Sequence, residues 1–281
     1  MFKIIEKKQF NDVTFSMTIH APLVAQNIQP GQFVMVMTDE DSERIPLTIS
    51  DFDKEKGSVT IVFQAIGAST IKLSHKNEGE EIAHFAGPLG AATELEGIKN
   101  ACVIGGGVGC AIALPQAKWL KNNGAMVDIV AGFRNKDIII LENEMIENST
   151  NCIICTDDGS YGTKGFVTNV LKENIEKGKQ YDCVIAIGPI PMMRAVSELT
   201  KEYGIKTIVS LNPIMIDGTG MCGGCRVKVG GQVKFACVDG PDFDGHQVDF
   251  AELMIRNNMY RKQEAEAKDH ICRMYGGIEN V

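Results

Sequence analysis

The first part of the chain carries short apolar runs at hairpin-like intervals. Turn-forming stretches such as QPGQ, DFDKEKGS and KNEGEE separate several of these runs. Short strands divided by turns are typical of antiparallel sheets, which can close into barrels. The pattern therefore predicts a small antiparallel β-barrel over residues 1–97, with strands near 2–5, 13–19, 33–37, 46–50, 59–65 and 81–85.

Between residues 98 and 211 the pattern changes. Largely apolar runs of four to six residues (ACVI, MVDIVA, NCIICT, CVIAI and TIVSL) alternate with helical stretches. Continuous apolar runs indicate strands that are buried on both faces, as in parallel βαβ units. This part of the chain is predicted to form an α/β domain with a doubly wound parallel sheet, the architecture of nucleotide-binding domains.

The rest of the chain divides into two further segments. Residues 212–248 are rich in glycine and cysteine, which predicts a small separate domain. Residues 249–281 are charged and helical in pattern, and we expect a tail of one or two helices that docks on another surface.

Composition and charge exclude several classes of protein. The chain has 281 residues, 44% of them hydrophobic, so it is long enough for two core-forming domains and an appendage. Its 36 acidic and 28 basic residues give a formal charge of -8 with no basic patch, which argues against nucleic-acid binding. Residues 100–116 are uncharged but contain four glycines and a proline, so we expect no membrane segment. The start, MFKIIEKKQF, lacks the apolar core of a secretory signal, and we expect a cytoplasmic protein.

The stretch DGTGMCGGCRVKVGGQVKFAC (217–237) has the spacing of a metal site. Cys222, Cys225 and Cys237 provide three thiols, and Asp217 stands four residues before the first. The resulting D-x4-C-x2-C-x11-C fits the plant-type spacing of a 2Fe–2S cluster in which a carboxylate replaces one thiolate. Glycine-rich turns allow backbone amides to face sulfur. A structural zinc site and a loop with free thiols are the alternatives on spacing alone.

Three turns of the α/β segment could hold a nucleotide. VIGGGVGC places Gly105–Gly109 between a strand and a helix, although Cys110 breaks the stricter G-x-G-x-x-G. TDDGSYG and AIGPIPMM also follow strands, where ligands of such sheets bind. Asp128 lies inside its strand and is a poor ribose ligand. Each turn taken alone could instead be a tight connection without a ligand, a reading that suits the second and third turns better than the first.

Two stretches of the barrel and a second cysteine pair are further candidate sites. RIPLTIS offers an arginine and hydroxyls, and QAIGASTIKL opens a short helix in a way that suits phosphate, although a plain strand and a capped helix are as consistent. Cys152 and Cys155 form a C-x-x-C within an apolar strand, which predicts buried structural thiols. The five histidines form no ligand cluster.

Taken in order, these motifs resemble one family over nearly the full chain. RIPLTIS with GAST, GGGVG with GP, and MCGGCRV with FACVDGPDFDG are similar to the motifs of ferredoxin reductase-like electron-transfer subunits. The resemblance implies an antiparallel β-barrel FAD domain, an α/β NAD domain with a doubly wound parallel sheet, and a small C-terminal 2Fe–2S domain with a helical tail.

The resemblance also implies the binding residues. FAD would be bound by residues of the barrel, which are Arg44, Pro46, Leu47, Thr48, Ser50, Val62, Phe63, Gln64, Gly67, Ser69 and Thr70. NAD(H) would be framed by the three turns, that is by Gly105, Gly106, Gly107, Val108, Gly109, Asp157, Gly159, Gly188 and Pro189. The cluster ligands would be Asp217, Cys222, Cys225 and Cys237. No side chain is expected to act as a general acid or base, because the cofactors carry the chemistry.

Two branches of this family are the main functional alternatives. The aspartate at the first ligand position and the charged tail resemble the small subunit of NADH-dependent reduced ferredoxin:NADP oxidoreductase, which works by flavin-based electron bifurcation. Its partner would be a larger iron–sulfur flavoprotein subunit that binds NADP(H) and ferredoxin. The electron-transfer subunit of dihydroorotate dehydrogenase B is the second reading. A zinc-stabilised nucleotide-binding regulator is a third, from another class.

Overall fold

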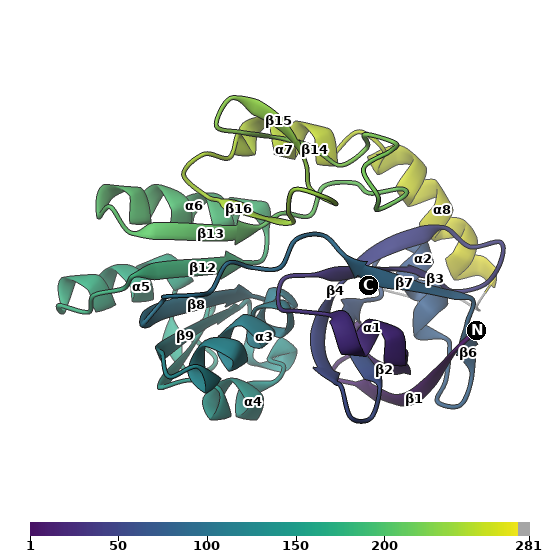
Figure 1. The fold of residues 1–281 in the computed structure, drawn as a ribbon, viewed down its shortest axis with the longest axis horizontal. Coiled ribbons are helices and arrows are strands. Elements are labelled where there is room, and N and C mark those ends of the chain that lie inside the picture. The colour runs from purple at the N-terminus through teal and green to yellow at the C-terminus, as the bar shows by residue number, and fades with distance from the viewer. Residues whose placement is uncertain (275–281) are drawn as a thin grey trace.

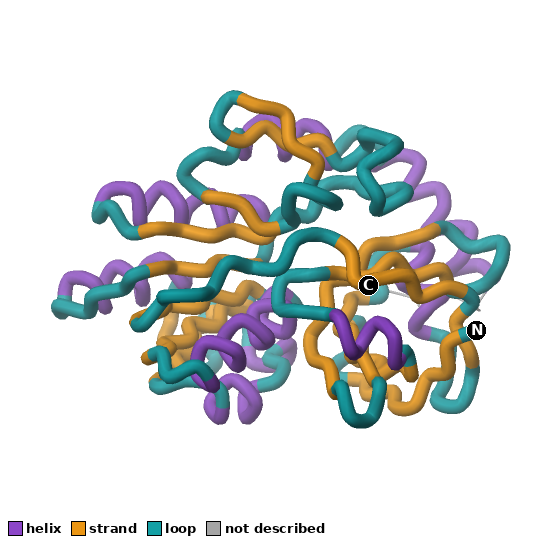
Figure 2. Tube along the Cα trace, viewed as in Figure 1, coloured by secondary structure: helices purple, strands orange, loops and turns teal. Residues whose placement is uncertain are grey.

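The computed structural model describes residues 1–274 and divides them between two large sheets and a C-terminal region (Figure 1). In Figure 1 the barrel lies at the lower right, the α/β sheet at the left, and the C-terminal region across the top. Figure 2 shows that strands dominate the barrel, whereas helices flank the second sheet. Residues 275–281 of the expected tail lie outside the described residues.

The barrel sheet has seven antiparallel strands in the order β6-β1-β2-β5-β4-β3-β7. Its interior is filled by alternate residues of each strand, such as Met17, Ile49 and Ile61, all fully buried. This confirms the predicted barrel. The strands are β1 (Phe2–Gln9), β2 (Thr14–His20), β3 (Phe33–Met37), β4 (Arg44–Asp53), β5 (Ser58–Gln64), β6 (Glu81–Ile82) and β7 (His84–Leu89), with helices α1 (Pro22–Asn27) and α2 (Ala68–Ser74).

The second sheet has the order β11-β10-β9-β8-β12-β13-β16 and is parallel except for β16. Helix α3 covers one face, while α5 and α6 contribute to the hydrophobic cluster on the other. This is the predicted doubly wound arrangement. Its elements are β8 (Asn100–Gly106), α3 (Gly109–Asn122), β9 (Met126–Phe133), a 3-10 turn (Lys136–Ile138), α4 (Glu142–Glu147), β10 (Asn151–Thr156), β11 (Thr163–Lys164), α5 (Val167–Glu176), β12 (Cys183–Ile187), α6 (Ile190–Glu202) and β13 (Lys206–Ser210).

The segment after residue 211 is attached to both sheets. It forms the hairpin of β14 (Arg226–Val229) and β15 (Gln232–Phe235), then β16 (Asp242–Asp244), α7 (Phe250–Asn257) and α8 (Arg261–Met274). Strand β16 pairs antiparallel with β13, so the predicted separate domain lends a strand to the α/β sheet. The pairing satisfies backbone groups that would otherwise line the exposed edge of β13.

The predicted tail helices pack on this chain. Phe250 and Leu253 of α7 are buried in the same hydrophobic cluster as Cys225 and Cys237. Helix α8 packs against α2 of the barrel, and Ile271 and Cys272 contact the barrel core. The described part of the tail therefore packs on this chain through one side, while no residue of α8 itself is buried.

Two expectations about single residues are confirmed. Asp128 is buried near the start of β9, far from its carboxyl end, and its carboxylate bonds Lys179, Tyr181 and Asn151 at 2.6–2.8 Å. In β10, Cys155 is buried and Cys152 half-buried, and burial raises the pKa of both thiols to about 11. Neither cysteine has the low pKa that a reactive thiol needs.

Asp242 lies where the three parts of the chain meet. Its Oδ2 accepts a hydrogen bond of 2.6 Å from Thr93 Oγ1, which lies in the connection between the two sheets. Its Oδ1 is buried and has no hydrogen-bond partner. Burial raises the pKa of this carboxyl to about 6, although the hydroxyls of Ser210 and Thr93 oppose the rise.

We expect Asp242→Asn to stabilise the protein at neutral pH. An unfolded aspartate has a pKa of about 3.9. The folded chain therefore holds an extra proton up to about pH 6, and its stability falls as the pH rises through that window. The asparagine removes this loss, so the free energy of unfolding should rise by about 3 kcal/mol at pH 7. Urea unfolding at pH values of about 4.5 and 7 tests this, with Asp244→Asn as the surface control. An equal gain at both pH values would contradict it.

None of the helices within residues 1–274 has the length and apolar character needed to cross a membrane.

Candidate functional site

The two glycine turns of the α/β sheet meet at its topological switch point. From β8 the chain moves outward through β9 and β10, and then returns to β12 on the other side of β8. The Cα of Gly106 lies 3.1 Å from the position that a Cβ on Gly188 would take. A Cβ on Gly109 would lie only 2.2 Å from the carbonyl oxygen of Ile187. The crevice between such strands is where doubly wound sheets bind ligands.

The third predicted turn lies at the same edge of the sheet. Asp157 and Gly159 follow β10, and the Asp157 N–H donates to the Phe133 carbonyl at the end of β9. Both residues are exposed. Because β8, β9, β10 and β12 run parallel, their carboxyl ends share one edge. The sequence-predicted NAD(H) residues are thus brought together there, with Val108 as the residue before α3.

In the barrel, β4 turns its two faces to different surroundings. Ile45, Leu47 and Ile49 pack in or against the barrel core. The alternate residues Arg44, Pro46 and Thr48 therefore lie on the outer face. Leu47 is thus on the core side, and Ser50, next to the register shift after Ile49, is buried. The outer face of β4 therefore carries three of the residues predicted to bind FAD.

The predicted residues of β5 divide in the same way. Phe63 is buried in the barrel core, where its ring stacks on Phe15 with centroids 6.0 Å apart. Val62 points outward into the cluster that includes Leu114 of α3. Gln64 is half-buried at the end of the strand. The side chain of Phe63 therefore contributes to the barrel interior, away from the outer face that carries Arg44.

The start of α2 presents the other predicted FAD residues. The Gly67 N–H donates to Thr70 Oγ1 (3.1 Å), and this hydroxyl donates back to the Gly67 carbonyl (3.0 Å). Ser69 Oγ donates to Glu43 Oε2 at 3.1 Å. A phosphate at this position would compete with the Glu43 carboxylate for the Ser69 hydroxyl.

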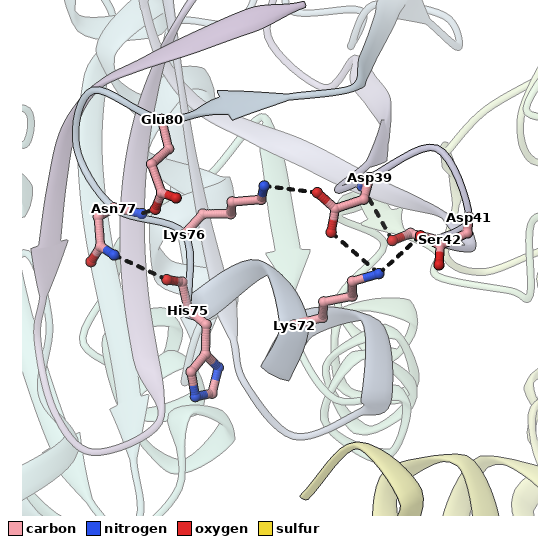
Figure 3. Close-up of polar contacts among 8 residues, drawn as sticks. All are labelled: Asp39, Asp41, Ser42, Lys72, His75, Lys76, Asn77 and Glu80. Atoms are coloured by element: carbon pink, nitrogen blue, oxygen red, sulfur yellow. Dashed lines mark hydrogen bonds and ion pairs between the residues drawn. The ribbon is translucent and has the colours of Figure 1, made fainter. Parts of the chain in front are cut away.

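Ion pairs fix the β3–β4 loop against α2 (Figure 3). Lys72 reaches Asp39 and Asp41 at 3.2 and 3.3 Å, and Lys76 reaches Asp39 at 2.7 Å. The bond from Lys76 is the main cause that lowers the pKa of Asp39. Within the loop, the Asp39 N–H donates to Ser42 Oγ. These contacts hold the loop against α2, and Glu43 of the same loop accepts from Ser69 at the start of the helix.

The four predicted cluster ligands form two pairs. Cys225 and Cys237 are both buried, and their sulfur atoms lie 3.1 Å apart. Asp217 and Cys222 are exposed or half-exposed on the glycine-rich loop, where the Cys222 N–H donates to Asp217 Oδ2 at 2.8 Å. The Gly224 N–H also donates to Cys222 Sγ at 3.4 Å. Two ligand pairs with amides that face sulfur suit a cluster of two irons, each of which takes two protein ligands.

The side chains of the four predicted ligands do not surround one common point. Within residues 1–274, no three histidine, cysteine or acidic side chains are arranged to hold a metal ion. The Asp217 carboxylate accepts from the amides of Thr219 and Cys222, and these bonds lower its pKa. Burial raises the pKa of Cys237 to about 12, so this thiol is neutral without a metal. The donor set fits a 2Fe–2S cluster in chemistry and pairing, and the assignment of the four ligands stays a prediction.

The cluster loop sits directly on the barrel. A Cβ on Gly218 would lie 2.7 Å from Met35 Cγ and 3.1 Å from Leu89 Cδ1. Met35 of β3 is paired across the sheet with Pro46 of β4. The predicted flavin strand and the predicted cluster loop are therefore separated by one strand.

Sequence reasoning missed several residues that position the site. Met35 was read only as a barrel strand residue and Leu89 lay outside the predicted strands, and nothing in their spacing marks a contact with the loop. Arg256 and Asn257 of α7 bond the carbonyls of Gly224 and Asn212. The amphipathic spacing of α7 predicts a packed helix, but it does not show what the helix packs against.

The comparisons with known proteins agree with this architecture. Residues 212–249 match the family described as the iron–sulfur cluster binding domain of dihydroorotate dehydrogenase B. A Thermotoga maritima protein named as a homolog of the dihydroorotate dehydrogenase B (NAD(+)) electron transfer subunit is 43% identical over 277 residues, which cover 99% of this chain and 98% of that protein.

This chain belongs to the dihydroorotate dehydrogenase B electron-transfer subunit family.

Two further relatives of this electron-transfer family were found. A Clostridium beijerinckii protein described as an uncharacterized protein in the adh 3′ region is 52% identical over 95% of this chain and 93% of its own. A chain from a structure of the NADH-dependent reduced ferredoxin-NADP oxidoreductase, solved to study flavin-based electron bifurcation, is 41% identical. It covers 96% of this chain and 97% of its own, with a TM-score of 0.92. The resemblance inferred from the motifs is confirmed, and the chain is an oxidoreductase electron-transfer subunit by family.

Proposed function

We propose that this chain carries electrons between NAD(H), FAD and a 2Fe–2S cluster, and passes them to a larger subunit. The observation that carries the proposal is the contact of the cluster loop with the barrel. Gly218 contacts Met35, and Met35 is paired with Pro46 on the predicted flavin strand. A loop held this close suits electron tunnelling, which requires a short and fixed distance between redox groups.

Three sets of residues would hold the three groups. FAD would lie along Arg44, Pro46 and Thr48, with its phosphates at Gly67, Ser69 and Thr70. NAD(H) would occupy the crevice between Gly105–Gly109 and Gly188–Pro189, beside Asp157 and Gly159. Asp217, Cys222, Cys225 and Cys237 would bind the cluster. When bound, FAD supplies the conversion between a hydride pair and single electrons, because iron–sulfur clusters take one electron at a time.

The chain itself would bind the cofactors, orient them and shield them from water. The switch-point turns bring backbone amides to the nucleotide phosphates, and the outer face of β4 orients the ring system. Met35, Leu89 and the buried Cys225 and Cys237 make the contact between barrel and cluster loop apolar, which excludes water from the path. No acid or base is required of any side chain.

For the partner, we propose a larger iron–sulfur flavoprotein that binds NADP(H) and ferredoxin, in a bifurcating complex. The similarity to the NADH-dependent reduced ferredoxin-NADP oxidoreductase chain supports this, as does Asp217 among the candidate ligands. The electron-transfer role in dihydroorotate dehydrogenase B is the second candidate, and the match of residues 212–249 favours it.

Anaerobic native mass spectrometry of the protein from its own cells tests the proposal. The expected mass includes FAD, two irons and two sulfides, together with a larger subunit. NADH-linked reduction of NADP with ferredoxin identifies the first candidate, whereas orotate formation identifies the second. A lone chain with zinc and no flavin would overturn the electron-transfer role and favour a zinc-stabilised nucleotide-binding regulator.

A further inference from the structure

The end of α7 holds the cluster loop at two points. Arg256 Nη2 donates to the Gly224 carbonyl at 3.2 Å, inside the C-x-x-C segment. Asn257 Nδ2 donates to the Asn212 carbonyl at 3.1 Å, where the chain enters the loop. Both residues are half-buried, and Phe250 and Leu253 anchor the helix in the core shared with Cys225 and Cys237. The guanidinium of Arg256 is thus fixed beside the predicted ligands.

Arg256 still has an unused donor. Its Nε is buried and has no hydrogen-bond partner. In residues 1–274, the buried side-chain polar atoms without a partner are Asn11 Nδ2, Asp242 Oδ1, Arg256 Nε and Asn257 Oδ1. Two of these four belong to the adjacent residues that clamp the loop. A buried N–H of a charged group without an acceptor is costly, which suggests that the missing acceptor is a group bound in the loop.

The charge of Arg256 has the sign that such a group would need. A 2Fe–2S cluster with four anionic ligands is negatively charged, and its reduction adds one more negative charge. Among the described residues, no carboxylate neutralises the guanidinium through an ion pair. A fixed cation beside the loop therefore stabilises the reduced form over the oxidised form.

We propose that Arg256 is a positioning residue that sets the potential of the 2Fe–2S cluster. It orients the Cys222–Cys225 loop through Gly224 and offsets the charge that the cluster gains on reduction. This inference rests on the proposed function, since it assumes the cluster at Asp217, Cys222, Cys225 and Cys237. It assigns a redox role to a residue outside the matched segment 212–249.

Redox titration monitored by electron paramagnetic resonance tests the inference on the complete protein. Arg256→Gln removes the charge and should lower the reduction equilibrium constant about tenfold, which is about 59 mV for a one-electron couple. Arg256→Lys keeps the charge, and its potential should stay near that of the wild type. Arg261→Gln, on the exposed start of α8, is the matched control and should leave the potential unchanged.

The outcomes separate this inference from the proposed function. A wild-type protein without a cluster would overturn the proposed function itself. A wild-type cluster whose potential is the same in Arg256→Gln would overturn only the role of Arg256. If Arg256→Gln loses the cluster, the Arg256→Lys variant decides, because it retains the charge. A fall of about tenfold in its reduction equilibrium constant would exclude an electrostatic role.

Discussion

Replacing Cys237 by serine is expected to abolish the cluster while NADH still reduces the flavin. Cys237 is buried, and its sulfur lies 3.1 Å from that of Cys225. Loss of this thiolate leaves one iron with a single thiolate, and the harder serine hydroxyl is a poor replacement for the second. The content of iron and labile sulfide per chain should fall by at least about tenfold. Anaerobic stopped-flow spectroscopy should show flavin bleaching by NADH but no cluster signal.

Cys272→Ser is the matched control, because Cys272 is half-buried on α8 against the barrel, away from the loop. It should keep full cluster content. Asp217→Cys should keep iron but change the potential, since a thiolate replaces a harder oxygen ligand. Unchanged iron in Cys237→Ser, or an Asp217→Ala variant with the wild-type cluster content and potential, would refute the respective ligand assignment.

The second large effect is expected at Gly109. An alanine Cβ there would lie 2.2 Å from the Ile187 carbonyl oxygen and 2.9 Å from Gly188 Cα. Both are backbone atoms of β12 and its turn, so no flexible side chain can move aside. We expect Gly109→Ala to lower the free energy of unfolding by about 3 kcal/mol and to weaken NADH binding at least tenfold. Denaturant unfolding and NADH titration measure the two effects.

Gly107→Ala in the same turn provides the comparison. Gly107 has φ of +56° but open space around its Cβ position, so the substitution costs only the backbone strain, about 1 kcal/mol. The contrast between the two variants isolates the close contact with β12. Equal losses in both would mean that the approach of the two turns does not limit stability.

The sequence predicts most of the architecture because its two patterns of apolar runs are distinct. Short apolar runs separated by turns lie before residue 98, and apolar runs that alternate with helical stretches follow, so barrel and parallel sheet could be told apart. The carboxyl-end rule then places Gly105–Gly109, Asp157 and Gly188 at one edge without any coordinates. The resemblance of the motifs, together with this order, anticipated the family.

Contacts across the three parts could not be predicted. The pairing of β16 with β13 joins residues 242–244 to an edge that no local pattern identifies. The docking of α7 under the cluster loop depends on two backbone carbonyls, and backbone carbonyls are identical in every sequence. The motif also does not show that the ring of Phe63 packs inside the barrel, and a contact of this residue with the flavin stays a prediction.

The packing of α8 on α2 has a kinetic consequence. The segment that carries the thiols is joined to the α/β sheet through β16 and to the barrel through α8, so both of its ends are anchored. A carrier domain on a flexible linker must find its donor by diffusion, at a rate set by linker length and solvent viscosity. Here that search is absent. Electron transfer within the chain should behave as a first-order process that is insensitive to viscosity, and only the encounter with outside proteins should depend on concentration.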